Sequence, residues 1–414
     1  MRRPALFQDV PVTSPSIPQD YVSPIAALVK AELAPQVQAI DREGAYPAAF
    51  LRKLGALGGL GAAIPAQHGG AGLGLAEQIE VMAQVGRECG STAFLVWCQA
   101  ACGWYLLRTP NDAVRERYLP PVAQGALMAG SGMSNTMKHL AGIEKMHVKA
   151  VRDGNGYVLN GSLPWVSNVG EDHLLIAAAE VPGTGYVMFA VEGGTAGLEF
   201  KACPEFAGLE GTRTLNVRFH DVRLAAADVL AHPDQFPDYI QRIKAGFVLL
   251  QTGMGIGITD ACLKIIQESN LMSAHVNAFL DDQGADLADE LAALKSAVHT
   301  LARRAGGRPA EGGDAPATAA PVAPVQVLKL RLRTSELALK AANSAVLHAG
   351  AKGYLMRHPA QRRLREAVFV AIVTPALKHL RKEIHRLERL AAEPALAAEQ
   401  AFAAEAASVR AEMA

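Results

Sequence analysis

The chain has 414 residues, of which half are hydrophobic and 19% are charged, as is typical of a globular protein rather than a disordered one. Its 40 Lys and Arg residues balance 40 Asp and Glu residues, so it lacks the basic excess that nucleic-acid binders usually carry. No apolar run reaches the ~18 residues of a membrane span. The composition therefore predicts neither a nucleic-acid partner nor a membrane partner.

The cysteines and histidines are not spaced as metal ligands. The five cysteines include no Cys-x-x-Cys pair, and the twelve histidines include no H-x-x-x-H pair, so no metal site is predicted. We interpret the cysteines as reduced, mostly buried thiols of a cytoplasmic protein. Residues 1–20 are Pro-rich and lack an apolar stretch of signal-peptide length, which predicts a loose N-terminal arm.

Residues 21–127 have apolar positions at helical spacing, as in Phe50, Leu51, Leu54 and Leu57, and predict an N-terminal helical domain. Gly-rich turns separate the helices, and Pro120-Pro121 is expected to stop one of them.

Residues 128–236 have short runs of period two and predict a middle β domain. Tyr157-Val158-Leu159 is followed by Asn160-Gly161 and another apolar run. Because Asn-Gly between apolar runs favours a two-residue turn, we expect a hairpin there.

Residues 237–390 return to helical spacing and predict a C-terminal helical bundle, interrupted by a flexible loop at 305–324. Residues 391–414 form an Ala/Glu-rich tail. The order helical, β, helical indicates an α+β fold rather than an alternating parallel sheet. Gly253, Gly255 and Gly257 do not match the G-x-G-x-x-G dinucleotide motif, and we interpret them as sites of close helix–helix approach.

Several short motifs occur in a fixed order along the chain. They are IPAQHGGAGLG at 64–74, CGSTA at 89–93, VRDGNGYVLNG at 151–161, WVSN at 165–168, GLEGTRT at 208–214 followed by FHDVR at 219–223, and GAKGY at 350–354. Together they resemble the signature segments of the acyl-CoA dehydrogenase family, over residues 47–366.

That resemblance implies an N-terminal helical domain, a β-barrel-like middle domain and a C-terminal four-helix bundle. It implies FAD at the interface of a homodimer or homotetramer, and possible partners are an acyl-CoA substrate and an electron-transfer flavoprotein or flavin reductase. Members remove a proton from the α-carbon of an acyl thioester and pass a hydride from the β-carbon to the flavin. The matching cofactor-binding positions are Met133, Ser134, Trp165, Ser167, Gly350 and Gly353. Trp165 and Ser167 are expected on one face of a strand.

Two segments differ from the family pattern near the expected flavin. Residues 134–142 read SNTMKHLAG in place of T-E-P-x-A-G-S-D, which predicts a changed substrate entrance. Residues 273–277 lack the arginine of the R-x-x-F-G segment that contacts the FAD diphosphate, although His275 could replace one contact. FMN therefore remains an alternative to FAD.

The catalytic base of the family is missing. Thr374 occupies the position of the glutamate in the Y-E-G-T segment, and the second position used by relatives lies within 244–259, which contain no carboxylate. A neutral hydroxyl does not accept an α-proton at neutral pH without a base of its own. We therefore assign no catalytic residue and expect slow desaturation of straight-chain acyl thioesters. Glu366 and Asp260 are the first carboxylates to test if turnover is fast.

These observations predict a flavin-dependent oxidoreductase of this family with a non-standard substrate or mechanism. One alternative is a two-component flavin monooxygenase, which needs no base for an α-proton. Another is a catalytically silent subunit that keeps the fold for assembly or ligand binding.

Overall fold

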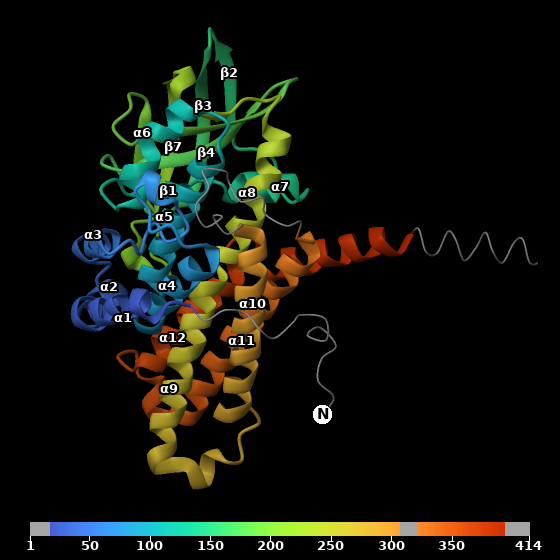
Figure 1. The fold of residues 1–414 in the computed structure, drawn as a ribbon. Helices are drawn as coiled ribbons and strands as arrows, with labels where there is room; N and C mark the ends of the chain where they lie inside the picture. Colours follow the sequence, from blue (N-terminus) through green and yellow to red (C-terminus); the bar gives the residue numbers. More distant parts are fainter. Residues whose placement is uncertain (1–16, 307–321, 394–414) are drawn as a thin grey trace, which may run out of the picture.

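The computed structural model describes residues 17–306 and 322–393. Figure 1 shows the β-sheet at one end of the molecule and the long C-terminal helices at the other, with the N-terminal helices packed beside the junction. The predicted arm at 1–20 lies mostly outside the described residues. Its last part is not loose, because Ile17 is buried and the first helix begins at Gln19.

The N-terminal helices include one apolar helix, α5, which packs between α4 and α6 and against the other two domains. The N-terminal helices are α1 (Gln19–Leu28), η2 (Val29–Leu33), η3 (Ala34–Gln36), α2 (Val37–Arg42), α3 (Ala48–Ala56), η4 (Ala66–His68), α4 (Leu75–Glu88), α5 (Gly90–Arg108) and α6 (Asp112–Ala123). Helix α5 is buried on all sides because it is apolar around its whole circumference. The two prolines expected to stop a helix lie inside the last turn of α6, which ends at Ala123.

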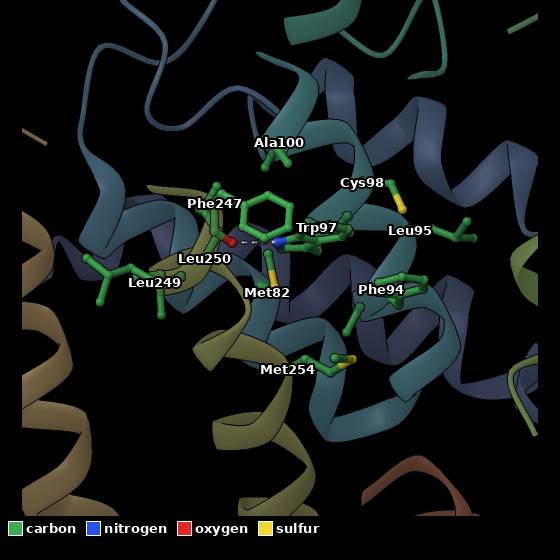
Figure 2. Close-up of a cluster of buried hydrophobic side chains, with 14 of the residues drawn as sticks. Met82, Phe94, Leu95, Trp97, Cys98, Ala100, Phe247, Leu249, Leu250 and Met254 are labelled. Atoms are coloured by element: carbon green, nitrogen blue, oxygen red, sulfur yellow. Dashed lines mark hydrogen bonds between the residues drawn. The ribbon is translucent and has the colours of Figure 1, made fainter. Parts of the chain in front are cut away.

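Trp97 of α5 joins the N-terminal helices to the C-terminal bundle. Its ring stacks on Phe94 and meets the edge of Phe247, each at 5.3 Å between ring centroids. Its indole N–H donates to the Phe247 carbonyl at 3.3 Å, as Figure 2 shows within the surrounding cluster of buried side chains. This core fixes the helix that carries Phe247 against α5.

The middle domain is an eight-stranded sheet with the order β6-β7-β3-β2-β4-β5-β8, and β1 pairs with β4. The strands are β1 (Ala129–Ser131), β2 (Val148–Asp153), β3 (Gly156–Val166), β4 (Leu174–Val181), β5 (Gly185–Glu192), β6 (Leu198–Ala202), β7 (Leu215–Leu224) and β8 (Val229–Ala231). Three short helices lie between strands: α7 (Ser134–Leu140), η5 (Glu210–Thr212) and η6 (Ala226–Asp228).

The hairpin predicted at Asn160-Gly161 is wrong. Strand β3 runs through both residues, and the β2–β3 hairpin turns instead at Gly154-Asn155, where Gly154 has φ +58°. The pairing of β3 with β7 shifts register between Leu159 and Gly161. Asn-Gly therefore marks a β-bulge, for which the glycine at φ +137° is suited.

The C-terminal region is a bundle of long helices. They are α8 (Phe236–Leu250), α9 (Thr252–Asn277), α10 (Gly284–Gly306), α11 (Pro324–Ala349), η7 (Gly350–Tyr354), α12 (Pro359–Ile372) and a final helix from 377 to 393. The predicted loop at 305–324 falls mainly on residues outside the described part. Residues 305–306 belong to α10, residues 322–323 are not helical, and Pro324 begins α11. Residues 391–393 of the predicted tail are helical, and the rest of that tail is not described.

The Gly253-x-Gly255-x-Gly257 stretch lies where α9 approaches two other helices, as predicted. A Cβ atom on Gly253 would lie 2.6 Å from the Ile79 carbonyl oxygen of α4, and one on Gly255 would lie 2.5 Å from Thr334 of α11. Larger residues at these positions would force the helices apart.

The segment Phe236–Asn277 contains a stretch that is long and apolar enough to cross a membrane by length and composition, and 83% of that stretch is buried inside the protein. Packing in the bundle accounts for its apolar character. All five cysteines are free, and each is buried except Cys203, which is half-buried.

Candidate functional site

A cavity of about 300 Å³ lies between the sheet domain and the helical bundle. One wall comes from α7 and the residues after it, and a second comes from α8 with Leu328 of α11. The third comes from the segment after α12 and from the final helix. Its lining is largely apolar and includes Met137, Leu140, Ile143, Ile240, Phe247, Val248, Leu328, Pro375 and Leu380. Its polar lining residues are Lys138, Gln241, Lys244, Thr374, His379, Glu383 and Arg386.

The α7 wall is tied down by its own polar side chains. Lys138 Nζ lies 2.7 Å from Glu144 Oε2, and Asn135 Nδ2 donates to Glu144 Oε1 at 2.7 Å. His139 turns toward the sheet, where its Nε2 lies 2.8 Å from the Tyr186 hydroxyl. The segment that departs from the family pattern is thus a short ordered helix whose Met137 and Lys138 face the cavity.

Thr374 and Ser134 meet at the edge of the cavity. Their hydroxyl oxygens lie 2.6 Å apart, although the residues are separated by 240 positions in the chain. The contact joins the first residue of α7 to the segment after α12. Sequence reasoning assigned separate roles to these residues and missed that they touch.

Arg331 is linked to the Thr374 segment through hydrogen bonds to Gln251. The Thr374 carbonyl accepts from Gln251 Nε2 at 2.8 Å, and Gln251 Oε1 accepts from Arg331 Nε at 2.9 Å. Arg331 also donates to the Val370 carbonyl at 2.6 Å and is fully buried. Burial lowers the pKa of this guanidinium to about 9. The arrangement positions the segment that carries Thr374, and nothing in the local sequence signalled it.

Trp165 and Ser167 lie at the end of β3, but they do not share one face. Trp165 is 64% exposed and has φ +55°, whereas Ser167 is buried and follows the last residue of the strand. The register shift between Leu163 and Val166 and the left-handed backbone break the two-residue alternation. The shared-face prediction is therefore wrong. The Ser167 hydroxyl lies 2.5 Å from that of Thr214, and the Trp165 ring meets the edge of Phe206.

Asn168 clamps the end of β3 and was missed by sequence reasoning. Its Nδ2 donates to the Ala129 carbonyl at 2.8 Å, and its Oδ1 accepts from the Tyr46 hydroxyl at 2.6 Å. It is fully buried with φ +58°, a conformation that Asn tolerates better than most residues. The same Tyr46 hydroxyl lies 3.2 Å from His173 Nε2. This network ties the WVSN motif at 165–168 to β1 and to the N-terminal domain.

Strand β1 and the residue after it, which lead into α7, pack on the end of β3. A Cβ on Gly130 would lie 2.5 Å from the Ser167 carbonyl oxygen, and one on Gly132 would lie 3.0 Å from Leu163. The structure therefore gathers Ser134, Trp165 and Ser167 around one edge of the sheet. Met133 lies there too, but its side chain is fully buried, so only its backbone is available to a ligand.

Comparisons with known proteins identify relatives of this chain. A family profile described as "Acyl-CoA dehydrogenase, N-terminal domain" matches residues 19–126. The mitochondrial isovaleryl-CoA dehydrogenase of Pongo abelii is 28% identical over 361 residues, covering 83% of this chain and 82% of that protein. The solved structure of butyryl-CoA dehydrogenase from Megasphaera elsdenii matches with a TM-score of 0.79 at 19% identity, covering 91% of this chain and 100% of that one.

The chain belongs to the acyl-CoA dehydrogenase family. This confirms the resemblance, the predicted three-part fold and the predicted class of activity, a flavin-dependent oxidoreductase. The dibenzothiophene monooxygenase of Paenibacillus sp. A11-2 has the same fold, with a TM-score of 0.73 at 17% identity, covering 89% of this chain and 96% of that one.

The residues at this edge of the sheet fit the ring portion of the flavin that acyl-CoA dehydrogenases use. The exposed Trp165 ring offers a flat apolar surface, and the hydroxyls of Ser134, Ser167 and Thr214 supply polar contacts. The segment expected to contact the diphosphate fits less well. Residues 271–280 contain no Lys or Arg, and His275 is exposed at the end of α9.

Gly350 and Gly353 lie apart from the other predicted flavin residues. Gly350 ends α11 with φ +59°, and Gly353 belongs to η7, which packs on α11 and α12. Asn277 Nδ2 donates to the His348 carbonyl at 3.3 Å, so these glycines lie beside the end of α9. The structure does not bring them to Ser134 or Trp165 within one chain.

Glu366 and Asp260, the two carboxylates named above as the first to test, do not line the cavity. Glu366 is buried, accepts from the Gly90 N–H at 2.9 Å and pairs with two arginines. Asp260 pairs with Arg87 on the outside of α9. The carboxylate that lines the cavity in the described part of the chain is Glu383, which accepts from Arg386 at 2.7 and 2.8 Å.

Proposed function

We propose that this acyl-CoA dehydrogenase family member oxidises a short acyl-CoA thioester between its α- and β-carbons, with FAD bound against Trp165 and Ser134. The observation that carries the proposal is the position of the cavity. It opens beside the Ser134–Thr374 contact, where the expected flavin segment and the expected base segment meet. FMN is the alternative cofactor to be tested.

The size and lining of the cavity support a short acyl chain. A volume of about 300 Å³ is at the lower end of the range for ligand pockets. Ile240, Phe247 and Leu328 offer an apolar surface, while Lys138, Lys244 and Arg386 add positive charge. This combination suits an apolar acyl group attached to an anionic carrier.

The chain's own residues have distinct tasks in this proposal. The apolar wall holds the acyl group and excludes water, and the Arg331–Gln251 contact holds the Thr374 segment in place. The Thr374 hydroxyl offers a hydrogen bond but not a base. The flavin, when bound, supplies the acceptor for the hydride.

Flavin binding and reduction test the proposal. We expect the purified protein to bind FAD and to lose its oxidised-flavin absorbance when butyryl-CoA is added under argon. We expect Trp165→Ala to weaken FAD binding by about tenfold, because stacking on an aromatic ring contributes ~1–3 kcal/mol. The ring is exposed, so the variant should unfold at the same temperature as the wild type.

The matched control is Val151→Ala, another exposed apolar residue of the same sheet, which should bind FAD as the wild type does. Titrating the flavin-free protein with FMN distinguishes the two cofactors. If Trp165→Ala binds FAD as tightly as the wild type does, FAD does not bind against Trp165.

A second candidate function is the two-component flavin monooxygenase, favoured by the fold shared with dibenzothiophene monooxygenase. In that case acyl thioesters leave the flavin oxidised, and the reduced flavin reacts with oxygen through a persistent hydroperoxide absorbance. A colourless protein that binds neither FAD nor FMN would instead indicate a catalytically silent subunit.

We propose further that the protein is a homodimer or homotetramer and that Gly350 and Gly353 contact the flavin of a neighbouring subunit. Large apolar side chains are exposed at the end of α9 and just after it, near the end of α11, and in and just after η7, and exposed apolar patches mark protein–protein interfaces. The exposed side chains are Leu271, Met272, Val276, Phe279, Leu347, Tyr354, Leu355 and Met356.

Sedimentation tests this assembly. We expect the wild type to sediment as a dimer or tetramer, and Phe279→Asp to shift it toward monomer with loss of flavin, because a charge at an apolar interface is costly. Val151→Asp is the control and should leave the assembly intact. A wild-type monomer that retains flavin would contradict the proposal.

We place the protein in the cytoplasm, which its free cysteines support. We propose an electron-transfer flavoprotein or a flavin reductase as its electron partner.

A further inference from the structure

His379 lies on the cavity wall beside Thr374, in the first turn of the final helix. It lines the cavity together with Thr374 and Pro375. Its Nδ1 is buried and has no hydrogen-bond partner in the described part of the chain, and none of the hydrogen bonds there involves its Nε2. A buried imidazole nitrogen without a partner is unusual, because buried polar groups are nearly always hydrogen-bonded.

The other ionisable side chains of the cavity are engaged or have no lone pair to offer. Lys138 pairs with Glu144, and Glu383 is held by two hydrogen bonds from Arg386. Lys244 carries an ammonium group, which donates hydrogen bonds and accepts none. Within the described cavity lining, His379 is the group with a free nitrogen that can accept a proton.

The charges around His379 keep its imidazole neutral at neutral pH. Burial lowers its pKa below the ordinary value, and Lys378, Lys138 and Lys382 lower it further, whereas Glu144 opposes them. These residues lie on its own helix and on the α7 wall, and the Glu383–Arg386 pair lies on the same helix. A neutral imidazole is the form that acts as a base.

We propose that His379 is the base that removes the α-proton of the acyl thioester, in place of the glutamate that Thr374 replaces. The proposal rests on the proposed function. The α-carbon–hydrogen bond breaks and a nitrogen–hydrogen bond forms on His379. The flavin, when bound, would supply the acceptor for the β-hydrogen and its electron pair, so the thioester would lose two electrons and the flavin would gain them. In this proposal a histidine of the final helix takes the task of the missing glutamate.

The test compares His379→Gln with His385→Gln, an exposed histidine of the same helix. We expect the rate of FAD reduction by butyryl-CoA under argon to fall by about 10²–10⁴-fold in His379→Gln, the usual contribution of a general base. The concentration of butyryl-CoA at half-maximal rate should stay the same. His385→Gln should behave as the wild type does.

The pH profile gives an independent readout. The wild-type reduction rate should fall as pH drops through a pKa below about 6.5, the ordinary histidine value, because the imidazole then becomes protonated. His379→Gln should lack this fall. If His379 had only a structural role, the rate in His379→Gln would fall with pH as it does in the wild type.

A third readout needs no turnover. In wild-type protein with ¹⁵N-labelled histidine and no flavin, the resonances missing from His379→Gln identify His379, and butyryl-CoA should shift them. If His379→Gln does not fold, the wild-type resonances are identified with His379→Asn instead.

The outcomes separate the two proposals. If butyryl-CoA reduces the FAD of the wild type and of His379→Gln at the same rate, the role of His379 is overturned and the proposed function stands. If no acyl thioester reduces the wild type, the proposed function fails. His379 resonances that do not respond to saturating butyryl-CoA would overturn the role of His379 in either case.

Discussion

Glu366→Gln should lower the free energy of unfolding by about 3–5 kcal/mol, the usual effect of breaking a buried ion pair. Glu366 Oε1 lies 3.0 Å from Arg362 and Oε2 lies 2.7 Å from Arg363, and all three side chains are buried. Removing the carboxylate charge leaves two guanidinium groups without a counter-charge inside the protein. The same carboxylate accepts from the Gly90 N–H at the start of α5, so the change also loosens the contact between α5 and α12.

The effect should depend on pH with a definite sign. Burial alone would raise the pKa of Glu366, but Arg363 and Arg362 outweigh burial and hold the pKa below its ordinary value. The stabilisation by Glu366 is therefore present above the pKa of an unfolded glutamate, about 4.3, and is lost as pH falls below it. Urea unfolding near pH 7 and near pH 4 measures both effects, and the difference between wild type and variant should shrink at the lower pH.

The control for Glu366 is Glu268→Gln, because Glu268 is exposed and its partner Lys264 is 3.9 Å away. Exposed pairs contribute at most ~1 kcal/mol, so this variant should unfold almost as the wild type does. If Glu366→Gln were equally stable, the buried charges would have to be compensated elsewhere. That result would reopen Glu366 as a residue free to act in catalysis.

Thr374→Glu combined with Pro375→Gly should restore flavin reduction in the His379→Gln background by about 10²-fold or more, since a placed base contributes ~10²–10⁴. Thr374 lines the cavity, and its hydroxyl already contacts Ser134. A carboxylate there would face the same space as the proposed substrate. The glycine is needed because a residue before proline is restricted to extended backbone conformations.

The amide variant Thr374→Gln, Pro375→Gly in the same background is the matched control, because it has the same shape without a basic oxygen. Anaerobic stopped-flow reduction by butyryl-CoA measures both variants. Equal rates for the glutamate and glutamine variants would show that position 374 does not face the α-carbon. The position of the cavity as the substrate site would then be wrong.

The sequence by itself determined the features that depend on local pattern. Helical spacing, then alternation, then helical spacing predicted the α+β order, and the ordered motifs predicted the family. The three glycines of α9 predicted close helix approach because only the absence of a Cβ allows it. In each case neighbouring residues carry the physical signal, so no knowledge of distant contacts was required.

The tertiary structure decided the features that depend on residues distant in the chain. Asn160-Gly161 forms a bulge because β3 continues against β7. Trp165 and Ser167 do not share a face because the backbone is left-handed at Trp165 and the β3–β7 register shifts there. The Ser134–Thr374 contact joins residues 240 positions apart. Whether Glu366 is paired and whether His379 has a free nitrogen depend on which side chains fold against them. Hydrogen bonding and burial are properties of the packed environment, and sequence spacing does not specify that environment.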